Sequence, residues 1–381
     1  MQALSGIRVL EFTTNIAGSI AGQTLGALGA DVIKIERPGT GDDCRAFGPP
    51  FVEGASMMYH TMNRGKRGVC LDLKSPQAIA WVESQLERCD VLIENLRPGT
   101  MDEIGLGAAA VRARHPRLVY CSVSAFGATG PLRGKPGYEE VVEAFAGMFS
   151  VNGDEAGRPS RVGFSVLDIG TGMWVVLGCM AALMERGRSG QGCVVTGSLV
   201  ETALAMLSIG LAGASESGRQ APRSRSGAAS VCVQRCFDTA DGEIVVAAGN
   251  DRLFAKLAAV VGRPEWAADE RYRNGKRRIE HRAFLHSTLE PIFRTAPTAQ
   301  WIARLEAAGV PCAPVNSLAD VLAEPQVRHL DMFDEIPGAR VRLARIPLRF
   351  DGRRPLMRGS APALGAHGRE LGAPEPGPVR D

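Results

Sequence analysis

The 381-residue sequence has little of several features that mark common protein classes. Aromatic residues make up only 6% of the chain, too few for the base-stacking platforms of single-strand nucleic-acid binders. The 44 basic and 41 acidic side chains leave a net charge of +3, far from that of a dedicated nucleic-acid binder. No uninterrupted apolar run reaches the roughly 18 residues of a membrane-spanning helix. We therefore expect no nucleic-acid partner and no membrane association.

Histidine and cysteine, the usual transition-metal ligands, form no metal-binding pattern. The six histidines make no H-E-x-x-H motif, and the nine cysteines are scattered. Only Cys232 and Cys236 lie close together, and no second pair or nearby histidine completes a zinc site. We expect no metal, and scattered cysteines are typical of a reducing compartment. Residues 1–10 lack the charged and apolar regions of a secretory signal, so we expect a cytoplasmic protein.

Apolar strands alternate with helices in the first half of the chain. The first strand is followed by a small-residue helix at residues 17–29, and a helix opened by Pro76 extends to about residue 88. The predicted strands cover residues 7–12, 31–37, 69–73, 90–94, 118–123 and 193–196. Because strand–helix–strand units favour parallel pairing, the sequence predicts an α/β fold with a parallel sheet.

A polar, basic stretch, SESGRQAPRSRSG at residues 215–227, predicts a linker between domains. It is followed by a strand at 243–248, a helix at 251–261 and a charged, helix-rich region over 263–324. This arrangement predicts a second, smaller α+β domain. The linker itself is either a solvated loop, which we favour, or a basic segment that steers an anion.

The first strand–helix–strand unit lacks the dinucleotide fingerprint. G-x-G-x-x-G should follow the first strand directly, but the turn here runs from Thr13 to Gly18, and the next glycine is Gly22. The spacing therefore favours a Rossmann-like scaffold that does not bind a nicotinamide cofactor.

Basic residues gather where a phosphorylated ligand would bind. Arg37 and Arg97 each follow the carboxyl end of a predicted strand, and ligands of open α/β sheets bind at that edge. The segment from Asn63 to Arg67, with sequence NRGKR, is equally compatible with a solvated turn and with a phosphate clamp. Convergence of these groups would indicate a phosphorylated ligand.

Two acidic residues are candidates for chemistry. Asp168 precedes an apolar helix from Ile169 to Arg186 that the sequence predicts to be buried. Its pattern favours an acid stabilised at a helix N-terminus, and the alternative is a carboxylate nucleophile whose small neighbours leave room for an acyl group. Glu139, taken alone, is typical of a helix surface.

Ordered blocks along nearly the whole chain resemble the class III coenzyme A transferases, the family of carnitine- and formyl-CoA transferases. The α-methylacyl-CoA racemases share their fold. The blocks are LSGIRVLEFT at 4–13, LGADVIKIERPGTGDDCR at 28–45, NRGKRGVCLDL at 63–73, VLIENLRPGTMDEIGL at 91–106, PGYEEVVEAFAGM at 136–148, RVGFSVLDIGTGMW at 161–174, AAGNDRLF at 247–254 and AAGVPCAPVNSL at 307–318.

The resemblance implies a Rossmann-like large domain built from both chain ends and a small α+β domain between them. Residues 1–212 would form the N-terminal part of the large domain and bind CoA. Residues 213–325 would form the linker and the small domain, and residues 326–381 would return to complete the large domain. The resemblance also implies an interlocked homodimer.

The resemblance further implies an enzyme that moves CoA from an acyl-CoA donor to a carboxylic acid acceptor, with CoA as a co-substrate and no permanently bound cofactor. The family nucleophile falls on Asp168 and the second active-site acid on Glu139, with aspartyl anhydride and aspartyl-CoA thioester intermediates. Backbone N–H groups near Gly170 or Gly172 would stabilise oxyanions. A short dicarboxylate such as succinate, oxalate or mesaconate is the expected acid. The implied CoA contacts are Ile16, Ala17, Arg37, Leu71, Asp72, Leu73, Lys74, Asn95, Leu96, Arg97 and Tyr138.

One departure from the family and two alternative functions follow from the same comparison. Formyl-CoA transferases carry an arginine where this chain has Glu103, which puts one phosphate contact in doubt. The first alternative is a 2-methylacyl-CoA racemase, which uses acid–base chemistry at the α-carbon. Its histidine would occupy the position of Tyr138, and no histidine lies between His115 and His281. The second alternative is a non-enzymatic CoA-binding role.

Overall fold

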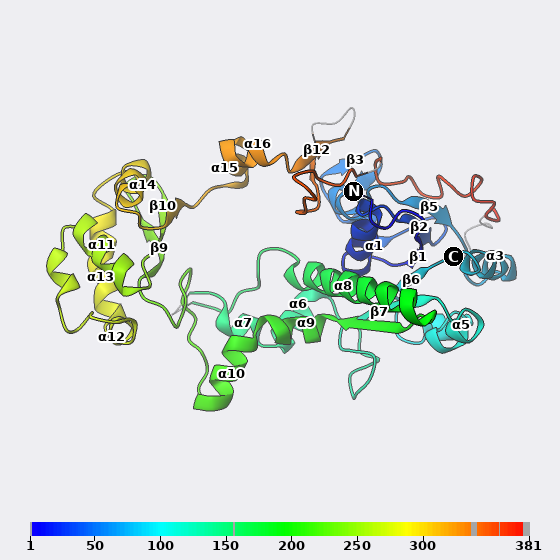
Figure 1. The fold of residues 1–381 in the computed structure, drawn as a ribbon, viewed down its shortest axis with the longest axis horizontal. Helices are drawn as coiled ribbons and strands as arrows, with labels where there is room; N and C mark the ends of the chain where they lie inside the picture. The colour runs from blue at the N-terminus through cyan, green and yellow to red at the C-terminus, as the bar shows by residue number, and fades with distance from the viewer. Residues whose placement is uncertain (1, 155–156, 337–340, 358, 376–381) are drawn as a thin grey trace. The chain divides into compact units, whose positions relative to one another are not determined.

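The computed structural model describes residues 2–154, 157–336, 341–357 and 359–375. The chain divides into two compact units (Figure 1). Unit 1 comprises residues 1–146, 162–208 and 331–381, and unit 2 comprises residues 147–161 and 209–330. The limits predicted from the sequence, after residues 212 and 325, lie a few residues from these, and the sequence pattern does not separate residues 147–161 from the large domain.

Unit 1 is built on a six-stranded, fully parallel sheet with strand order β5-β2-β1-β6-β7-β8. The strands are β1 (Arg8–Phe12), β2 (Asp31–Glu36), β5 (Arg67–Cys70), β6 (Val91–Glu94), β7 (Val119–Ser124) and β8 (Val194–Ser198). Strands buried on both faces appear in the sequence as near-continuous apolar runs, which explains why their positions could be predicted. The predicted α/β class with a parallel sheet is confirmed.

One predicted strand is displaced. The strand expected at residues 69–73 is β5, which ends at Cys70, paired with Glu36 of β2. Beyond that pair the chain leaves the sheet, and Leu71 keeps only a single backbone hydrogen bond to the carbonyl of Glu36. Apolarity alone does not distinguish the end of a strand from the buried residues that follow it.

Helices cover both faces of this sheet. Three pack with one face in a shared apolar cluster: α3 (Pro76–Leu86), α4 (Thr100–Glu103) and α5 (Ala108–Arg114). Two lie side by side along the other face: α1 (Ala17–Ala27) and α8 (Val166–Ser189) (Figure 1). The chain passes from β1 outward to β2 and β5, and then from β6 outward to β7 and β8 on the other side. The strand order thus reverses between β1 and β6, and ligands of open α/β sheets bind at such a point.

Helix α8 is buried only in part, whereas the sequence predicted a buried helix. Met173, Trp174 and Leu177 are each more than half exposed in the single chain. By length and composition α8 is apolar enough to cross a membrane, as is the bent pair of α9 (Leu199–Met206) and α10 (Ser208–Ser217), although a mostly buried core helix passes the same test. Charged residues such as Asp168 and Glu201 interrupt the apolar runs of these helices, so neither stands out in the sequence as one long apolar run.

The remaining elements of unit 1 are short. Two hairpins, β3 with β4 and β12 with β13, are antiparallel. The elements are η1 (Asp43–Ala46), β3 (Phe51–Val52), β4 (Ala55–Ser56), α2 (Met57–Asn63), α6 (Glu139–Phe145), β12 (Phe333–Glu335) and β13 (Arg342–Ala344).

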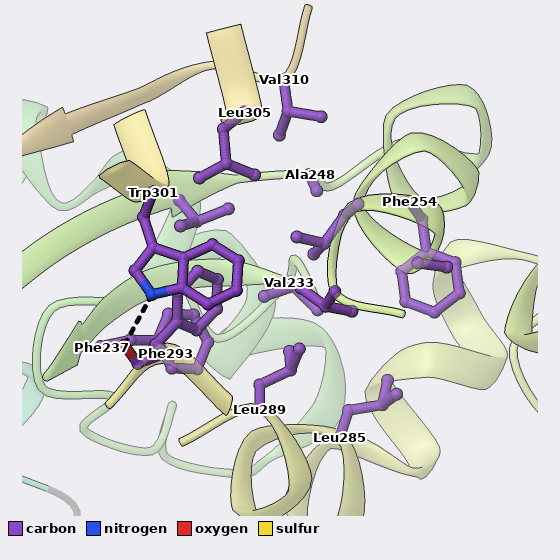
Figure 2. Packing of buried hydrophobic residues seen from close by; sticks show 14 of the residues in the cluster. Val233, Phe237, Ala248, Phe254, Leu285, Leu289, Phe293, Trp301, Leu305 and Val310 are labelled. Carbon is purple, nitrogen blue, oxygen red and sulfur yellow. Dashed lines mark hydrogen bonds between the residues drawn. The ribbon is translucent and has the colours of Figure 1, made fainter. Parts of the chain in front are cut away.

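Unit 2 holds an antiparallel sheet with order β11-β10-β9 and its own apolar core. Figure 2 shows this core, in which the Trp301 indole donates a 2.7 Å hydrogen bond to the carbonyl of Phe293. The elements of the unit are α7 (Met148–Val151), α10, β9 (Gln234–Asp238), β10 (Glu243–Ala247), α11 (Asp251–Val260), η2 (Pro264–Ala267), α12 (Gly275–Glu280), α13 (Arg282–Phe293), α14 (Thr298–Ala307), β11 (Cys312–Pro314), α15 (Leu318–Ala323) and α16 (Pro325–Leu330).

Candidate active site

A cavity of about 480 Å³ in unit 1 opens at the carboxyl ends of β1, β6 and β7. Its walls are the turn Thr14–Ala17 after β1, the segment Asn95–Pro98 after β6, and residues that follow β7 up to Tyr138. Asp168, in the first turn of α8, completes the lining. The cavity therefore lies at the switch point of the sheet, where the strand order places a ligand.

A second cavity of about 260 Å³ lies beside the first and shares Thr14, Arg37 and Leu96 with it. The segment Leu71–Lys74, which follows β5, forms much of its wall. Together the two cavities make an elongated surface along the carboxyl edge of β5, β2, β1 and β6. An extended ligand with one apolar and one charged part would fit such a surface.

The structure gathers the residues that the sequence analysis assigned to CoA around these two cavities. Those at the first cavity are Ile16, Ala17, Arg37, Asn95, Leu96, Arg97 and Tyr138, and those at the second are Arg37, Leu71, Asp72, Leu73, Lys74 and Leu96. Their assignment to CoA stays a prediction. Glu103, which ends α4, is exposed and lines neither cavity.

Asp168 lies at the third residue of α8, so its carboxyl group is close to the unpaired N–H groups of the helix start. A helix N-terminus stabilises a carboxylate, but burial and the negative charge of Glu139 act in the opposite direction. Together they raise the pKa of Asp168 to about 7. Around neutral pH this group is therefore divided between an ionised form and a protonated form.

Glu139 is not the surface residue that its sequence position predicted. It is 4% exposed, and its Oε2 accepts a 3.1 Å hydrogen bond from the backbone N–H of Asp168. Its second oxygen, Oε1, has no hydrogen-bond partner among the described residues. Burial raises the pKa of the Glu139 carboxyl group. Glu139 thus caps the start of α8, which Ser165 leaves without a side-chain cap.

Four cationic side chains line the first cavity: Arg37, Arg97, Arg133 and Lys135. Arg37 is held by Asp43 and by the hydroxyl of Thr40. Arg133 and Lys135 were not predicted from the sequence, and neither makes an ion pair with a described residue. They lie well beyond Ser124, the last residue of β7, whereas Arg37 directly follows β2, so a position next to a strand end gives no signal for them.

The segment Asn63–Arg67 is neither a solvated turn nor a phosphate clamp. Lys66 is fully buried and donates to Glu11 Oε1 at 2.9 Å, while the buried Arg64 pairs with Asp334 of β12. Arg67 pairs with Asp31 of β2. These partners come from distant parts of the chain, so the local charge pattern could not reveal them.

Gly170 and Gly172 are packing positions rather than oxyanion donors. Both lie beyond the first turn of α8, whose N–H groups alone are left unpaired by the helix. A Cβ at Gly172 would approach the carbonyl oxygen of Ala17 to 2.7 Å, and one at Gly170 would approach Met206 to 2.6 Å. These glycines let α8 approach α1 and α9 closely.

Known proteins resemble this chain over almost its full length. The model of CoA-transferase family III matches residues 4–368. A succinyl-CoA:glutarate CoA-transferase of Mus musculus is 34% identical over 97% of this chain and 86% of its own length. A succinate–glutarate CoA-transferase of Agrobacterium fabrum is 36% identical over 96% of this chain and 93% of its own. The crystal structure of a CAIB/BAIF family protein from Brucella suis has a TM-score of 0.86 and 34% identity, covering 97% of this chain and 98% of its own.

Fold and relatives together define an α/β enzyme that transfers coenzyme A between acyl-CoA thioesters and carboxylic acids. Within that class, the chain belongs to CoA-transferase family III. The resemblance drawn from the sequence blocks is therefore confirmed.

Proposed function

We propose that Asp168 is the nucleophile of a CoA-transferase that acts on short dicarboxylic acids. The observation that carries the proposal is the position of its carboxyl group, which lines the first cavity at the start of α8 beside a cationic wall. A carboxylate with a pKa of about 7 is more basic, and hence more nucleophilic, than an ordinary aspartate. Its partial ionisation near neutral pH keeps a reactive fraction available.

The chemistry requires no oxidant, metal or water. The Asp168 carboxylate attacks the donor thioester carbonyl, the C–S bond breaks, and a mixed anhydride forms as CoA thiolate leaves. The thiolate then attacks Cγ of Asp168, which releases the donor acid and forms an aspartyl-CoA thioester. The acceptor carboxylate attacks this thioester, and the thiolate returns to the acceptor carbonyl of the resulting anhydride. Acyl-CoA product leaves, and the Asp168 carboxylate is restored.

In this scheme the two cavities divide the CoA molecule between them. The cationic lining of the first cavity, which includes Arg97, faces the phosphate oxygens, because guanidinium groups donate well to phosphate. The leucine side chains of Leu71 and Leu73 offer an apolar surface for the adenine. Glu139 orients α8 through the N–H of Asp168 and raises the pKa of the nucleophile, so it acts without touching the acyl group.

The choice of dicarboxylic acids rests on the names of the relatives. Besides the two glutarate enzymes, a CoA-transferase of Acetobacter aceti that is 34% identical is named for acetyl-CoA and oxalate. A second carboxylate needs a cation, and Lys135 lines the same cavity as Asp168. A panel of acyl-CoA donors crossed with mono- and dicarboxylic acids, read by mass spectrometry, tests this part. Preference for monocarboxylic acids would contradict it.

The nucleophile is tested by Asp168→Asn, with Glu140→Gln as the control. Glu140 is an exposed neighbour of Glu139 and does not line the cavity, so its variant should transfer CoA as the wild type does at pH 8. D168N should lose transfer while staying folded. Mass spectrometry of wild-type enzyme incubated with succinyl-CoA should find a covalent adduct on the peptide that contains Asp168.

Substantial transfer by D168N, or an adduct confined to another peptide, would overturn the assignment. Incorporation of deuterium at the α-carbon of a 2-methylacyl-CoA, without an acceptor acid, would instead indicate a racemase. The residues that line the first cavity include no histidine, which such a reaction would be expected to need.

We also propose that the enzyme works as a homodimer in the cytoplasm. The exposed apolar side chains of α8 in the single chain support a partner surface on unit 1. All nine cysteines are free, in keeping with a reducing compartment.

A further inference from the structure

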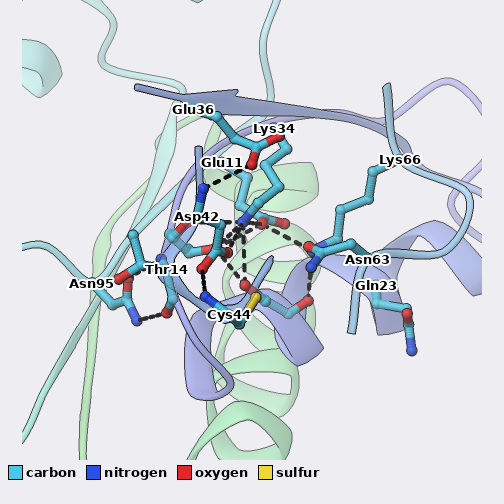
Figure 3. Close-up of polar contacts among 12 residues, drawn as sticks. Glu11, Thr14, Gln23, Lys34, Glu36, Asp42, Cys44, Asn63, Lys66 and Asn95 are labelled. Carbon is cyan, nitrogen blue, oxygen red and sulfur yellow. Dashed lines mark hydrogen bonds and ion pairs between the residues drawn. The ribbon is translucent and has the colours of Figure 1, made fainter. Parts of the chain in front are cut away.

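The turn after β1, residues Thr13–Asn15, is fastened by side chains on two sides. Figure 3 shows Thr14 with Asn95, and it labels Lys34 and Asp42, which hold the other side. On one side the amide of Asn95 clamps Thr14. Its Oδ1 accepts from the Thr14 N–H at 2.8 Å, and its Nδ2 donates to the Thr14 carbonyl at 2.8 Å. Asn95 was predicted from the sequence as a CoA contact. Both polar atoms of its amide bind the backbone of the turn.

On the other side a buried ion pair holds the neighbouring residues. Lys34 Nζ donates to the carbonyl of Thr13 at 2.8 Å, and Asp42 Oδ1 accepts from the Asn15 N–H at 2.9 Å. Lys34 Nζ and Asp42 Oδ2 are 2.9 Å apart, and both side chains are fully buried. Four backbone groups of three consecutive residues are therefore satisfied by three side chains.

Asn15 explains why the turn needs such fastening. Its φ is +60°, in the left-handed region that non-glycine residues seldom adopt and that asparagine tolerates best. A turn in this conformation is costly unless its surroundings hold it. Thr14, Asn15 and the residues that follow line the first cavity, so the position of the turn sets the shape of the proposed CoA site.

The charges of this pair persist despite burial. Burial alone would lower the pKa of Lys34, but the carboxylates of Glu11 and Asp42 outweigh it and raise the pKa above its usual value. For Asp42, burial is outweighed by Lys34 and by the backbone N–H of Asn15, which lower its pKa. A charged pair can bind a carbonyl and an N–H at once, which apolar residues of the same volume could not do.

A second buried lysine in the same network offers an internal comparison. Lys66 Nζ donates to Glu11, to the carbonyl of Ser19 and to Asn63, each within 3 Å. None of these groups lines the first cavity. Lys66 thus contacts no backbone group of the turn. It reaches the turn only through Glu11 Oε1, which also accepts from Thr13 Oγ1 at 2.6 Å, whereas Lys34 and Asp42 hold the backbone itself.

We propose that Asp42, with Lys34, is a positioning residue that fixes the CoA-binding turn, and that it acts on substrate affinity rather than on the acyl-transfer chemistry. This inference rests on the proposed function. Asp42 Oδ1 accepts from the N–H groups of Asn15 and Cys44, and Oδ2 is ion-paired with Lys34, although the residue lies at the wall of the second cavity. Its effect on CoA therefore passes through the backbone that it holds, which is the turn and the start of η1.

The test compares Asp42→Asn with Lys66→Met in the full-length enzyme. Kinetics with succinyl-CoA at saturating acceptor, CoA binding by calorimetry and thermal melting are measured for both. Both variants should melt below the wild type, because each disrupts a buried charge network. Only D42N should raise KM for succinyl-CoA and Kd for CoA, by about tenfold, with kcat changed less than about twofold.

Lys34→Arg keeps the test decisive if D42N does not fold, because it keeps the buried positive charge but removes the Lys34 ammonium from the Thr13 carbonyl of the same turn, and Lys34 lines neither cavity. It should raise KM in the same way. A wild-type KM in D42N or, if that variant does not fold, in K34R would overturn the inference and leave the network as an interior brace. Failure of the proposed function is distinguishable, since the wild type itself would then transfer no CoA.

Discussion

At the scale of single residues, the two carboxyl groups at the start of α8 govern how the site responds to pH. Glu139 approaches the backbone of Asp168, and its charge raises the pKa of the nucleophile beyond what burial alone does. The protonated form of Asp168 cannot attack a thioester. Activity should therefore be lost as the pH falls through about 7, the pKa of that group.

Glu139→Gln should shift this acid limb to lower pH. The amide keeps an acceptor for the N–H of Asp168 but removes the negative charge, so the Asp168 carboxylate forms more easily. We expect the midpoint of the kcat profile to fall by about one pH unit, equivalent to about 1.4 kcal/mol of lost repulsion. Glu140→Gln, which removes a charge of smaller effect on Asp168, should shift the midpoint less.

The measurement is kcat between pH 5 and 9 at saturating substrates. An unchanged midpoint in E139Q would show that the charge of Glu139 does not raise the pKa of Asp168. Activity that rises as the pH falls would contradict Asp168 as an ionised nucleophile.

Residue positions were more predictable than residue roles. The sequence places Asp168 at a helix start, but the pattern alone favoured a stabilising acid and only the family resemblance implied a nucleophile. Its altered pKa could not be predicted, because burial and the charge of Glu139 depend on tertiary contacts. The same limit applies to Lys66, whose partner Glu11 lies 55 residues away along the chain. A local pattern of charges cannot reveal whether a lysine will be buried against a carboxylate from a distant part of the chain.

At the scale of elements, the close approach of α8 to α1 places Asp168 beside the turn that lines the cavity. Gly172 makes this approach possible, since a Cβ there would lie 2.3 Å from Ile20 Cγ2 and 2.7 Å from the Ala17 carbonyl oxygen. The flexible Ile20 side chain can move aside, but the backbone of α1 cannot do so cheaply.

Gly172→Ala should therefore lower the free energy of unfolding and slow CoA transfer. Overpacking of this kind costs about 1–3 kcal/mol, and the displaced start of α8 should lower kcat as well. Urea unfolding and steady-state kinetics measure the two effects.

Gly187→Ala on the same helix is the matched control. Nothing lies within 4 Å of a Cβ at Gly187, so the change should stabilise the helix by about 0.5–1 kcal/mol and leave kcat unchanged. Equal effects of the two alanines would mean that helix propensity, and not contact with α1, dominates at Gly172.

Most elements of unit 1 could be predicted because parallel strands are continuous apolar runs and Pro76 opens α3 as a first-turn proline. The pairing order could not be predicted, since register depends on long-range contacts. The exposed face of α8 was also missed. Its hydropathy is high on all sides, which gives no sign of the side that remains uncovered in a single chain.

At the scale of the whole molecule, the exposed apolar residues of α8 predict the oligomeric state. Light scattering after size exclusion should give twice the chain mass of 40.5 kDa. Leu177→Glu places a charge on a side chain that is 59% exposed in the single chain, and it should convert the protein to monomer or aggregate and abolish transfer.

Arg188→Glu, an exposed charge change on the same helix, should leave both mass and activity unchanged. A wild-type protein that is monomeric and active would refute the dimer. Dimeric L177E with full activity would place the partner surface elsewhere.

The turn after β1 has a consequence for how the enzyme acquires its activity during folding. Its anchors come from β2, from the loop before η1 and from the segment after β6, which are separated by many residues along the chain. The turn cannot be fixed until all of these segments have assembled. Ligand affinity should therefore emerge only after these segments, the last of which follows β6, have docked on one another, and a truncated or nascent chain that lacks β6 should have secondary structure but no capacity to recognise CoA.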